Sequence, residues 1–169
     1  MNSKYVNNDL NNFGFTIILA SMIGGMMEIG WVSIYSSLSS VSAINVAREI
    51  SVTILPYTAD TFYAPMLGIF IHLLLSLLLV IFFAAIILKP AVRRYGKLGI
   101  MLSSIMILGI VWAVNFFIVL PILNPSFILL MPYIVTLISK LLFGLAMGLV
   151  LVKSSSNSCH SEYPTRMSG

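Results

Sequence analysis

Four long apolar stretches constrain the fold of this chain more than any other feature of its sequence. They cover residues 13–38, 66–88, 98–120 and 128–152, and each reaches the roughly 20 residues that a helix needs to cross a bilayer. The composition agrees with membrane spans, because 59% of the 169 residues are hydrophobic and only 8% are charged. Each stretch is continuously apolar, whereas the strands of a membrane barrel alternate between apolar and polar residues. We predict an all-α membrane protein with four transmembrane helices, and the composition excludes a soluble domain.

Polar segments flank the four stretches. We expect residues 1–12 to form a cytoplasmic leader and the Ser-rich residues 153–169 to form a disordered cytoplasmic tail. The first stretch is longer than the apolar part of a secretory signal and lacks a small-residue cleavage pattern. We therefore expect it to be kept as a helix.

Positively charged residues predict the orientation of the chain. Lys89, Arg93, Arg94 and Lys97 lie in the short link between the second and third stretches. Cytoplasmic loops carry an excess of such residues, so this link and both termini are predicted to face the cytoplasm. Beside a membrane, a basic link of this kind indicates topology and contact with anionic lipid rather than binding of nucleic acid. We expect a location in a bacterial inner membrane.

The first outer loop contains a segment with helical periodicity. In residues 44–55, most apolar side chains fall on one side of a helix and most polar ones on the other, and Pro56 follows. We predict an interfacial helix that lies on the outer leaflet or caps the bundle. Two interpretations stay open: a helix that only shields the top of the bundle, and a partner-docking surface that presents Arg48 and Glu49.

Ionisable residues inside the apolar stretches are the most specific signal for a site. Glu28, His72 and Lys140 lie in three different stretches, and Asn115 lies in the remaining one. Charge in hydrocarbon is costly and persists where it faces a partner or a wet cavity. Their positions along the helices put all four in the outer half of the membrane, so we expect one polar network with a Glu28–Lys140 ion pair. Small residues on the same helix faces predict close helix packing: Ala20, Gly24, Gly68, Ser76, Gly144 and Gly148.

Such a polar centre has three interpretations. It is a buried ion pair that fixes which helices meet, a proton or ion path, or a metal site. The metal site has the least support, because methionines such as Met26 suit Cu(I) but are also ordinary membrane filler, and no two His or Cys residues occur at ligand spacing within a helix. Cys159 and His160 are adjacent in the tail, where an unpaired Cys is most often a reduced bystander. We expect no metal and no cofactor.

Several short motifs occur in order along the chain. They are a Gly-rich first stretch, an amphipathic outer segment, a second stretch with Gly68 and His72, a third that runs through Trp112-Ala113-Val114-Asn115-Phe116-Phe117 into Leu120-Pro121 and Asn124-Pro125, and a fourth with Gly144 and Gly148. This order resembles small, functionally uncharacterised four-helix integral membrane proteins of bacteria. The resemblance implies the fold and the topology and carries over no activity. Pro132 and Tyr133 stand where relatives are expected to have a polar residue or His, which weakens a metal site further.

Two functions from different classes remain open. Enzyme signatures such as a phosphate loop, HExxH, CxxC or a nucleophile elbow are missing, so we expect the chain to be no enzyme by itself. The first function is an accessory or structural subunit of a larger inner-membrane complex, such as a membrane monooxygenase or a respiratory enzyme. The second is a homo-oligomeric transporter or channel for protons, ions or small molecules, built around Glu28, His72 and Lys140.

Overall fold

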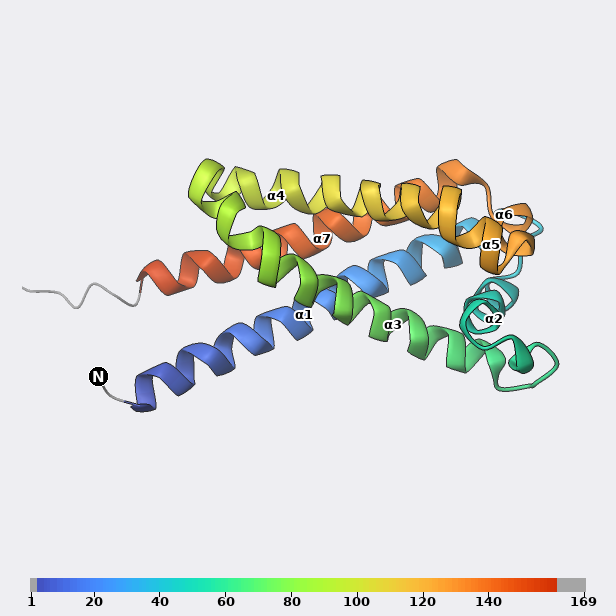
Figure 1. Cartoon of the computed structure of the whole chain (residues 1–169), viewed down its shortest axis with the longest axis horizontal. Coiled ribbons are helices and arrows are strands. Elements are labelled where there is room, and N and C mark those ends of the chain that lie inside the picture. The colour runs from blue at the N-terminus through green and yellow to red at the C-terminus, as the bar shows by residue number, and fades with distance from the viewer. Residues whose placement is uncertain (1–2, 161–169) are drawn as a thin grey trace, which may run out of the picture.

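Helices make up every regular element in the described part of the chain. The computed structural model describes residues 3–160, with side chains described over residues 13–154. Seven elements are α-helices, η1 is a 3-10 helix, and η2 and η3 are π-helical turns. In chain order they are α1 (Ser3–Ser37), α2 (Ala43–Ile54), η1 (Pro56–Thr58), α3 (Ala64–Phe82), η2 (Phe83–Ile87), α4 (Leu88–Val114), η3 (Asn115–Val119), α5 (Leu120–Leu123), α6 (Pro125–Leu130) and α7 (Tyr133–His160) (Figure 1).

Three stretches of the described chain are long and apolar enough to cross a membrane. They are Phe13–Ser37, Ala64–Leu123 and Tyr133–Ser154. The prediction of an all-α chain with apolar helices of spanning length is therefore confirmed. The middle stretch holds 60 residues and covers two of the four predicted spans. It reverses direction at Gly96, whose φ of 58° lies in the left-handed region that glycine tolerates, so α3 and α4 run in opposite directions (Figure 1).

Prolines explain most of the irregular helix geometry. The π-helical turn η2 ends three residues before Pro90, and η3 ends two residues before Pro121. Proline has no N–H and crowds the preceding turn, and a wider π turn takes up the mismatch. Pro132 separates α6 from α7, and Met131 before it is extended with φ of −121° and ψ of 120°. Pro132 therefore lies directly before the first residue of α7 and does not kink this helix.

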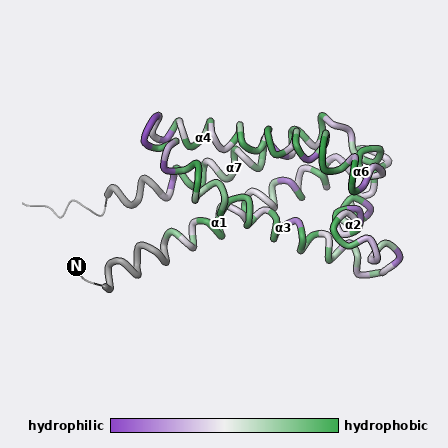
Figure 2. The backbone as a smooth tube through the Cα atoms, in the orientation of Figure 1, coloured by the Kyte–Doolittle hydropathy of each residue, from purple (hydrophilic) through white to green (hydrophobic). Residues whose placement is uncertain are grey.

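The long helices form an open row rather than a closed bundle. α3 packs on α1, α1 on α7, and α7 on α4. From the turn at Gly96, α3 and α4 diverge (Figure 1). We call the end with this turn the basic end, because its exposed Lys89, Arg93, Arg94 and Lys97 gather there with the first residues of α1 and the last of α7. The opposite end, built by α2, η1, α5 and α6, is the cap end. Figure 2 shows hydrophilic residues at both ends and mainly hydrophobic helices between them.

The half of the assembly near the basic end is filled by apolar side chains from α1, α3, α4 and α7. Every member of the central cluster exposes 2% of its surface or less, and burial of this kind is the main favourable term in packing. The members are Ala20, Val80, Phe83, Ile100, Leu108, Phe143, Met147 and Leu151. Side chains from all four long helices therefore pack together in this half of the molecule.

The amphipathic segment forms α2, within one residue of the predicted 44–55. It packs along α3 at the cap end, which agrees with the capping alternative. A Cβ on Gly68 would overlap the carbonyl of Ala47, so the two helices touch through their backbones there. Gly68 was expected to be a helix-packing residue, and the helix that it packs against is α2.

The ends of the chain differ from the expected loops. α1 begins at Ser3, so residues 3–12 of the expected leader are helical. α7 continues through Lys153 to His160, where a disordered tail was expected, because extending a formed helix costs little compared with starting one. Residues 161–169 of the expected tail, and residues 1–2 of the leader, lie outside the described residues.

Candidate functional site

The polar centre is a buried carboxylate held by α7. Glu28 on α1 exposes 3% of its surface. The Nζ atom of Lys140 lies 2.7 Å from its Oε1 and 2.8 Å from its Oε2. The hydroxyl of Ser139 donates to Oε1 at 3.2 Å. The expected pairing of Glu28 with Lys140 is thus present, and the two oxygens share one cation, as a buried charge requires.

His72 approaches the same carboxylate from α3. Its Nε2 lies 3.4 Å from Oε2 of Glu28, which is longer than a well-formed hydrogen bond. The same nitrogen is buried and forms no hydrogen bond with the described residues. The structure therefore brings together one carboxylate, one ammonium group and one imidazole from three helices, and Nε2 of the imidazole has no hydrogen-bond partner among the described residues.

Two adjacent glycines let three helices meet at this point. A Cβ on Gly24 would lie 3.0 Å from the ring of Phe143 on α7, and one on Gly25 would lie 3.1 Å from Oγ of Ser76 on α3. Gly24 and Ser76 were expected packing residues, and Gly25 was missed. The Gly-Gly pair in the sequence is the signal that marks it, because neighbouring glycines open two faces of a helix at once.

The glycines of α7 serve a different contact from the one expected. Gly144 and Gly148 were placed on the face of Lys140, but they pack against α4. A Cβ on Gly144 would lie 2.9 Å from the Ser104 carbonyl, and one on Gly148 would lie 3.0 Å from Sδ of Met101. Successive positions four residues apart drift around a helix, so Lys140 reaches α1 while the glycines reach α4.

A cavity of about 690 Å³ begins at the polar centre and extends toward the cap end. Its walls come from α1, α2, α3, α4 and α7, and most lining side chains are apolar. Its size falls within the range of about 300–1,000 Å³ usual for small-molecule sites. The polar residues among its lining are Glu28, Ser33, Thr53, His72, Ser76, Asn115, Thr136, Ser139 and Lys140.

Asn115 lines this cavity but does not join the polar centre. Trp112 donates from Nε1 to Oγ1 of Thr136 at 3.0 Å, which fixes the level of α4 against α7. Asn115 lies three residues from Trp112 toward the cap end, and Lys140 lies four residues from Thr136 in the opposite direction. At the rise of a helix, the two residues are separated by about 10 Å along the helix axis. The prediction of one four-residue network is therefore wrong for Asn115: the polar centre consists of Glu28, His72 and Lys140, and the amide of Asn115 lies apart from it.

A second polar cluster lies at the cap end. Asn124 donates from Nδ2 to Oε2 of Glu49 at 2.8 Å and to Oγ1 of Thr53 at 2.9 Å. Its Oδ1 accepts from the N–H of Phe127 and thereby caps α6. Asn124 precedes Pro125 in the sequence, and an Asn at this position is a capping signal for the helix that follows.

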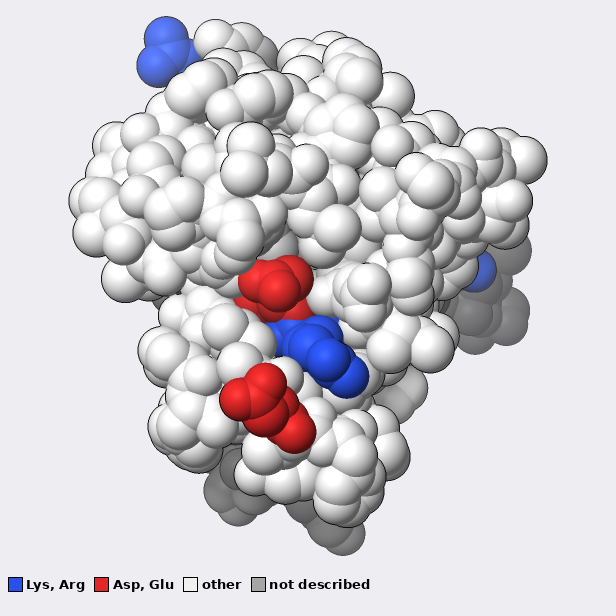
Figure 3. All heavy atoms as spheres, turned by 90° about the vertical axis from the view of Figure 1, so that its right-hand side faces the viewer, with Lys and Arg blue, Asp and Glu red and all other residues white. Residues whose placement is uncertain are grey.

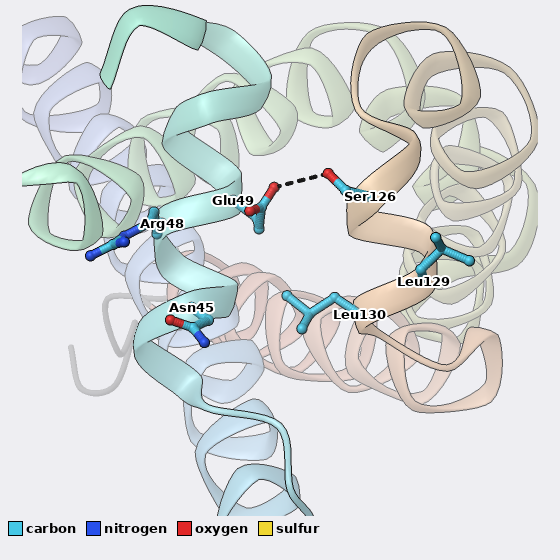
Figure 4. A pocket seen from close by; sticks show the side chains of 6 residues that line it. All are labelled: Asn45, Arg48, Glu49, Ser126, Leu129 and Leu130. Atoms are coloured by element: carbon cyan, nitrogen blue, oxygen red, sulfur yellow. Dashed lines mark hydrogen bonds between the residues drawn. The ribbon is translucent and has the colours of Figure 1, made fainter. Parts of the chain in front are cut away.

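The expected docking residues occupy different surroundings in this cluster. Figure 3 views the cap end, where a small group of acidic and basic side chains lies within a mostly uncharged surface. A second, shallow pocket at the cap end is lined by Asn45, Arg48, Glu49, Ser126, Leu129 and Leu130. In Figure 4, Glu49 points toward Ser126, whereas Arg48 points away from Ser126. Glu49 is thus engaged within the chain, and only Arg48, whose Nε forms no hydrogen bond with the described residues, keeps an unused donor.

Metal ligands do not gather in the described part of the chain. Among the described residues, no group of three or more His, Cys, Asp or Glu side chains is close enough to hold an ion. The side chains of Cys159 and His160 are not among those described. No family model matches the chain, and neither a curated protein nor a solved structure matches it. The site is therefore interpreted from its own chemistry.

Proposed function

We propose that this chain is a membrane-embedded binding protein that takes up an apolar molecule dissolved in the bilayer. The observation that carries the proposal is the position of the Glu28–Lys140 pair where the cavity meets the packed cluster. Small-molecule sites are typically apolar hollows with a few convergent polar groups, which is the arrangement found around this pair.

The filled half of the assembly favours binding over conduction. Toward the basic end, the polar centre meets the packed cluster that includes Phe143, Met147 and Leu108, each without exposed surface. A path for protons or ions across the membrane needs polar groups or water at every level. Phe143 belongs both to this cluster and to the cavity lining, so the cavity meets packed side chains on this side, as expected for a binding site and not for a pore.

The topology that goes with this proposal has four membrane spans. The reversal at Gly96 divides the stretch Ala64–Leu123 into two antiparallel arms, each long enough to cross a bilayer. Lys89, Arg93, Arg94 and Lys97 are exposed at the basic end, so the positive-inside rule favours a cytoplasmic basic end with both termini beside it. A bacterial inner membrane fits this orientation.

A second candidate function is that of an accessory subunit of a larger membrane complex. The divergence of α3 and α4 favours it, because the opening between them is bordered by exposed apolar side chains such as Ile69 and Val114. A spanning helix of another subunit would bury these residues. The two candidates use the same opening and differ in what fills it.

Two tryptophan substitutions on α4 test the binding function. Val114 lines the cavity and exposes 45% of its surface, whereas Val92 near the basic end exposes 43% and lies outside the cavity lining. The full chain is purified in mild detergent, and bound small molecules are identified by mass spectrometry after organic extraction. We expect an apolar compound to co-purify with the wild type and with Val92→Trp and to be lost from Val114→Trp.

The same purification separates the two candidates. A stoichiometric protein partner that is lost from Val114→Trp and kept by Val92→Trp supports the accessory subunit. The absence of any co-purifying compound from all three proteins, in the absence of a partner, contradicts the binding function. A compound retained equally by both variants contradicts it as well.

A further inference from the structure

We propose that the molecule bound in the cavity has an uncharged polar head, with a carbonyl or hydroxyl oxygen, attached to an apolar body. This inference rests on the proposed binding function and names its ligand class. The feature behind it is the charge balance of the polar centre together with its unused hydrogen-bonding groups.

The charge balance excludes a charged head. Glu28 and Lys140 carry opposite charges and lie within 2.8 Å of each other, so together they contribute no net charge. An anionic or cationic head would add one uncompensated charge to an apolar cavity, where the loss of hydration is not repaid. A neutral head leaves the balance unchanged.

The polar centre has hydrogen-bonding groups that a ligand oxygen can satisfy. An ammonium group has three N–H donors, and the carboxylate of Glu28 accepts through two oxygens, so Lys140 keeps a donor for a ligand. The buried Nε2 of His72 also has no hydrogen-bond partner among the described residues. A carbonyl oxygen accepts from Lys140, and a hydroxyl group accepts from it while its own proton is free for His72.

The walls of the cavity fit the same class of molecule. Between the polar centre and the cap end, most lining residues are apolar, and the polar side chain that η3 contributes is the neutral amide of Asn115. Ile69 of α3 and Val114 of α4 line the cavity and are exposed, so a molecule dissolved in lipid can reach the cavity between these two helices without crossing water. A single apolar chain or ring system with a neutral end fits the apolar lining and is soluble in lipid.

Three photoreactive probes test the head group directly. They share one alkyl chain with a diazirine and end in a hydroxyl, a sulfonate or a trimethylammonium group. The full chain is reconstituted in lipid nanodiscs at pH 8, where an ordinary imidazole is neutral. Labelled peptides are quantified by mass spectrometry. We expect the hydroxyl probe to label cavity-lining peptides about tenfold more than either charged probe, a ratio that corresponds to about 1.4 kcal/mol.

Charge variants then reverse the preference in a defined way. Glu28→Gln leaves Lys140 unbalanced and should shift labelling toward the sulfonate probe. Lys140→Met leaves Glu28 unbalanced and should shift it toward the trimethylammonium probe. The double variant removes both charges, so the preference for the hydroxyl probe should return. Glu49→Gln is the matched control, because this carboxylate lies in the cap-end cluster outside the cavity lining.

The possible outcomes separate this inference from the function on which it rests. Equal labelling by all probes, or stronger labelling by a charged probe in the wild type, overturns the neutral head and leaves binding intact. Failure of every probe to label cavity peptides in the wild type overturns the binding function as well. If a single variant does not fold, the double variant decides, since it has no unpaired charge: labelling dominated by a charged probe there contradicts the inference.

Discussion

The two halves of this molecule are built from similar apolar helices, but the half near the basic end is filled, whereas the half near the cap end holds a cavity beside a smaller buried cluster of Val46, Met131 and Val135. In that half, Gly144 and Gly148 allow α7 to approach the backbone of α4. In the half near the cap end, Gly68 allows α3 to approach α2 instead, and α3 leaves α4. In a membrane, lipid is as apolar as leucine, so the placement of small residues decides which helices touch. Hydropathy alone does not distinguish the two halves.

The ion pair lies on the border between the halves. Glu28 has the filled cluster on one side and the cavity on the other. A charge in this position is tolerated because Lys140 balances it and Ser139 donates to it. The difference between the halves can therefore be tested by substitutions at four places: the border, the filled half, the α2–α3 contact and the cap-end cluster.

The largest effect is expected at the border. Lys140→Met leaves the carboxylate of Glu28 buried without a cation, and we expect a loss of about 4 kcal/mol in the free energy of unfolding. Equilibrium unfolding in mixed detergent micelles, followed by the fluorescence of Trp31 and Trp112, measures it. The double variant with Glu28→Gln should recover at least half of the loss. Additive losses from the two substitutions would show that the residues do not act as a pair.

The filled half should respond next most strongly. Phe143→Ala removes a ring with no exposed surface from the central cluster, and we expect it to cost about 3 kcal/mol in the same unfolding measurement. Phe70→Ala is the control, because Phe70 on α3 exposes 64% of its surface. Equal losses from both would contradict the difference between filled core and lipid-facing surface.

The contact that draws α3 away from α4 is tested by adding one methyl group. Gly68→Ala places a Cβ against the carbonyl of Ala47, so we expect a loss of about 2 kcal/mol and faster proteolysis of α2. Gly30→Ala meets nothing within 4 Å and should be neutral or slightly stabilising, because alanine favours the helix. A neutral result at Gly68 would mean that α2 does not rest on α3.

The smallest effect is expected in the cap-end cluster. Asn124→Ala removes hydrogen bonds between uncharged or partly exposed groups, namely those to Glu49 and Thr53 and the cap of α6, and it leaves no buried charge without its counter-ion. We expect a loss of about 1 kcal/mol in unfolding free energy. Asn45→Ala, an exposed position on α2, is the control and should change little. A loss at Asn124 as large as that at Lys140 would remove the distinction between the two polar clusters.

Much of the fold follows from local patterns in the sequence. Continuous apolar stretches define the long helices, and apolar periodicity with Pro56 places α2 to within one residue. The pairing of Glu28 with Lys140 also follows, because a buried charge requires a partner and Lys140 was the cation at a similar depth.

Other features depend on which faces meet in three dimensions. Gly68, Gly144 and Gly148 are recognisable as packing residues, but the helices that they contact are not, because several helices compete for each small face. The cavity is a space that no single residue encodes, so Asn115 was assigned to a network from which about 10 Å of helix separates it. The bond between Asn124 and Glu49 joins positions far apart in the sequence, where no periodicity is informative.

The turn at Gly96 connects the two long arms through a single residue in the left-handed region. The two arms that border the cavity entrance are joined there, at the end of the molecule farthest from that entrance. At a rise of about 1.5 Å per residue, rotating α4 by about 5° at this turn displaces its far end by about 2 Å. Any rotation of α4 about this turn would therefore change the distance between α3 and α4 at the cap end.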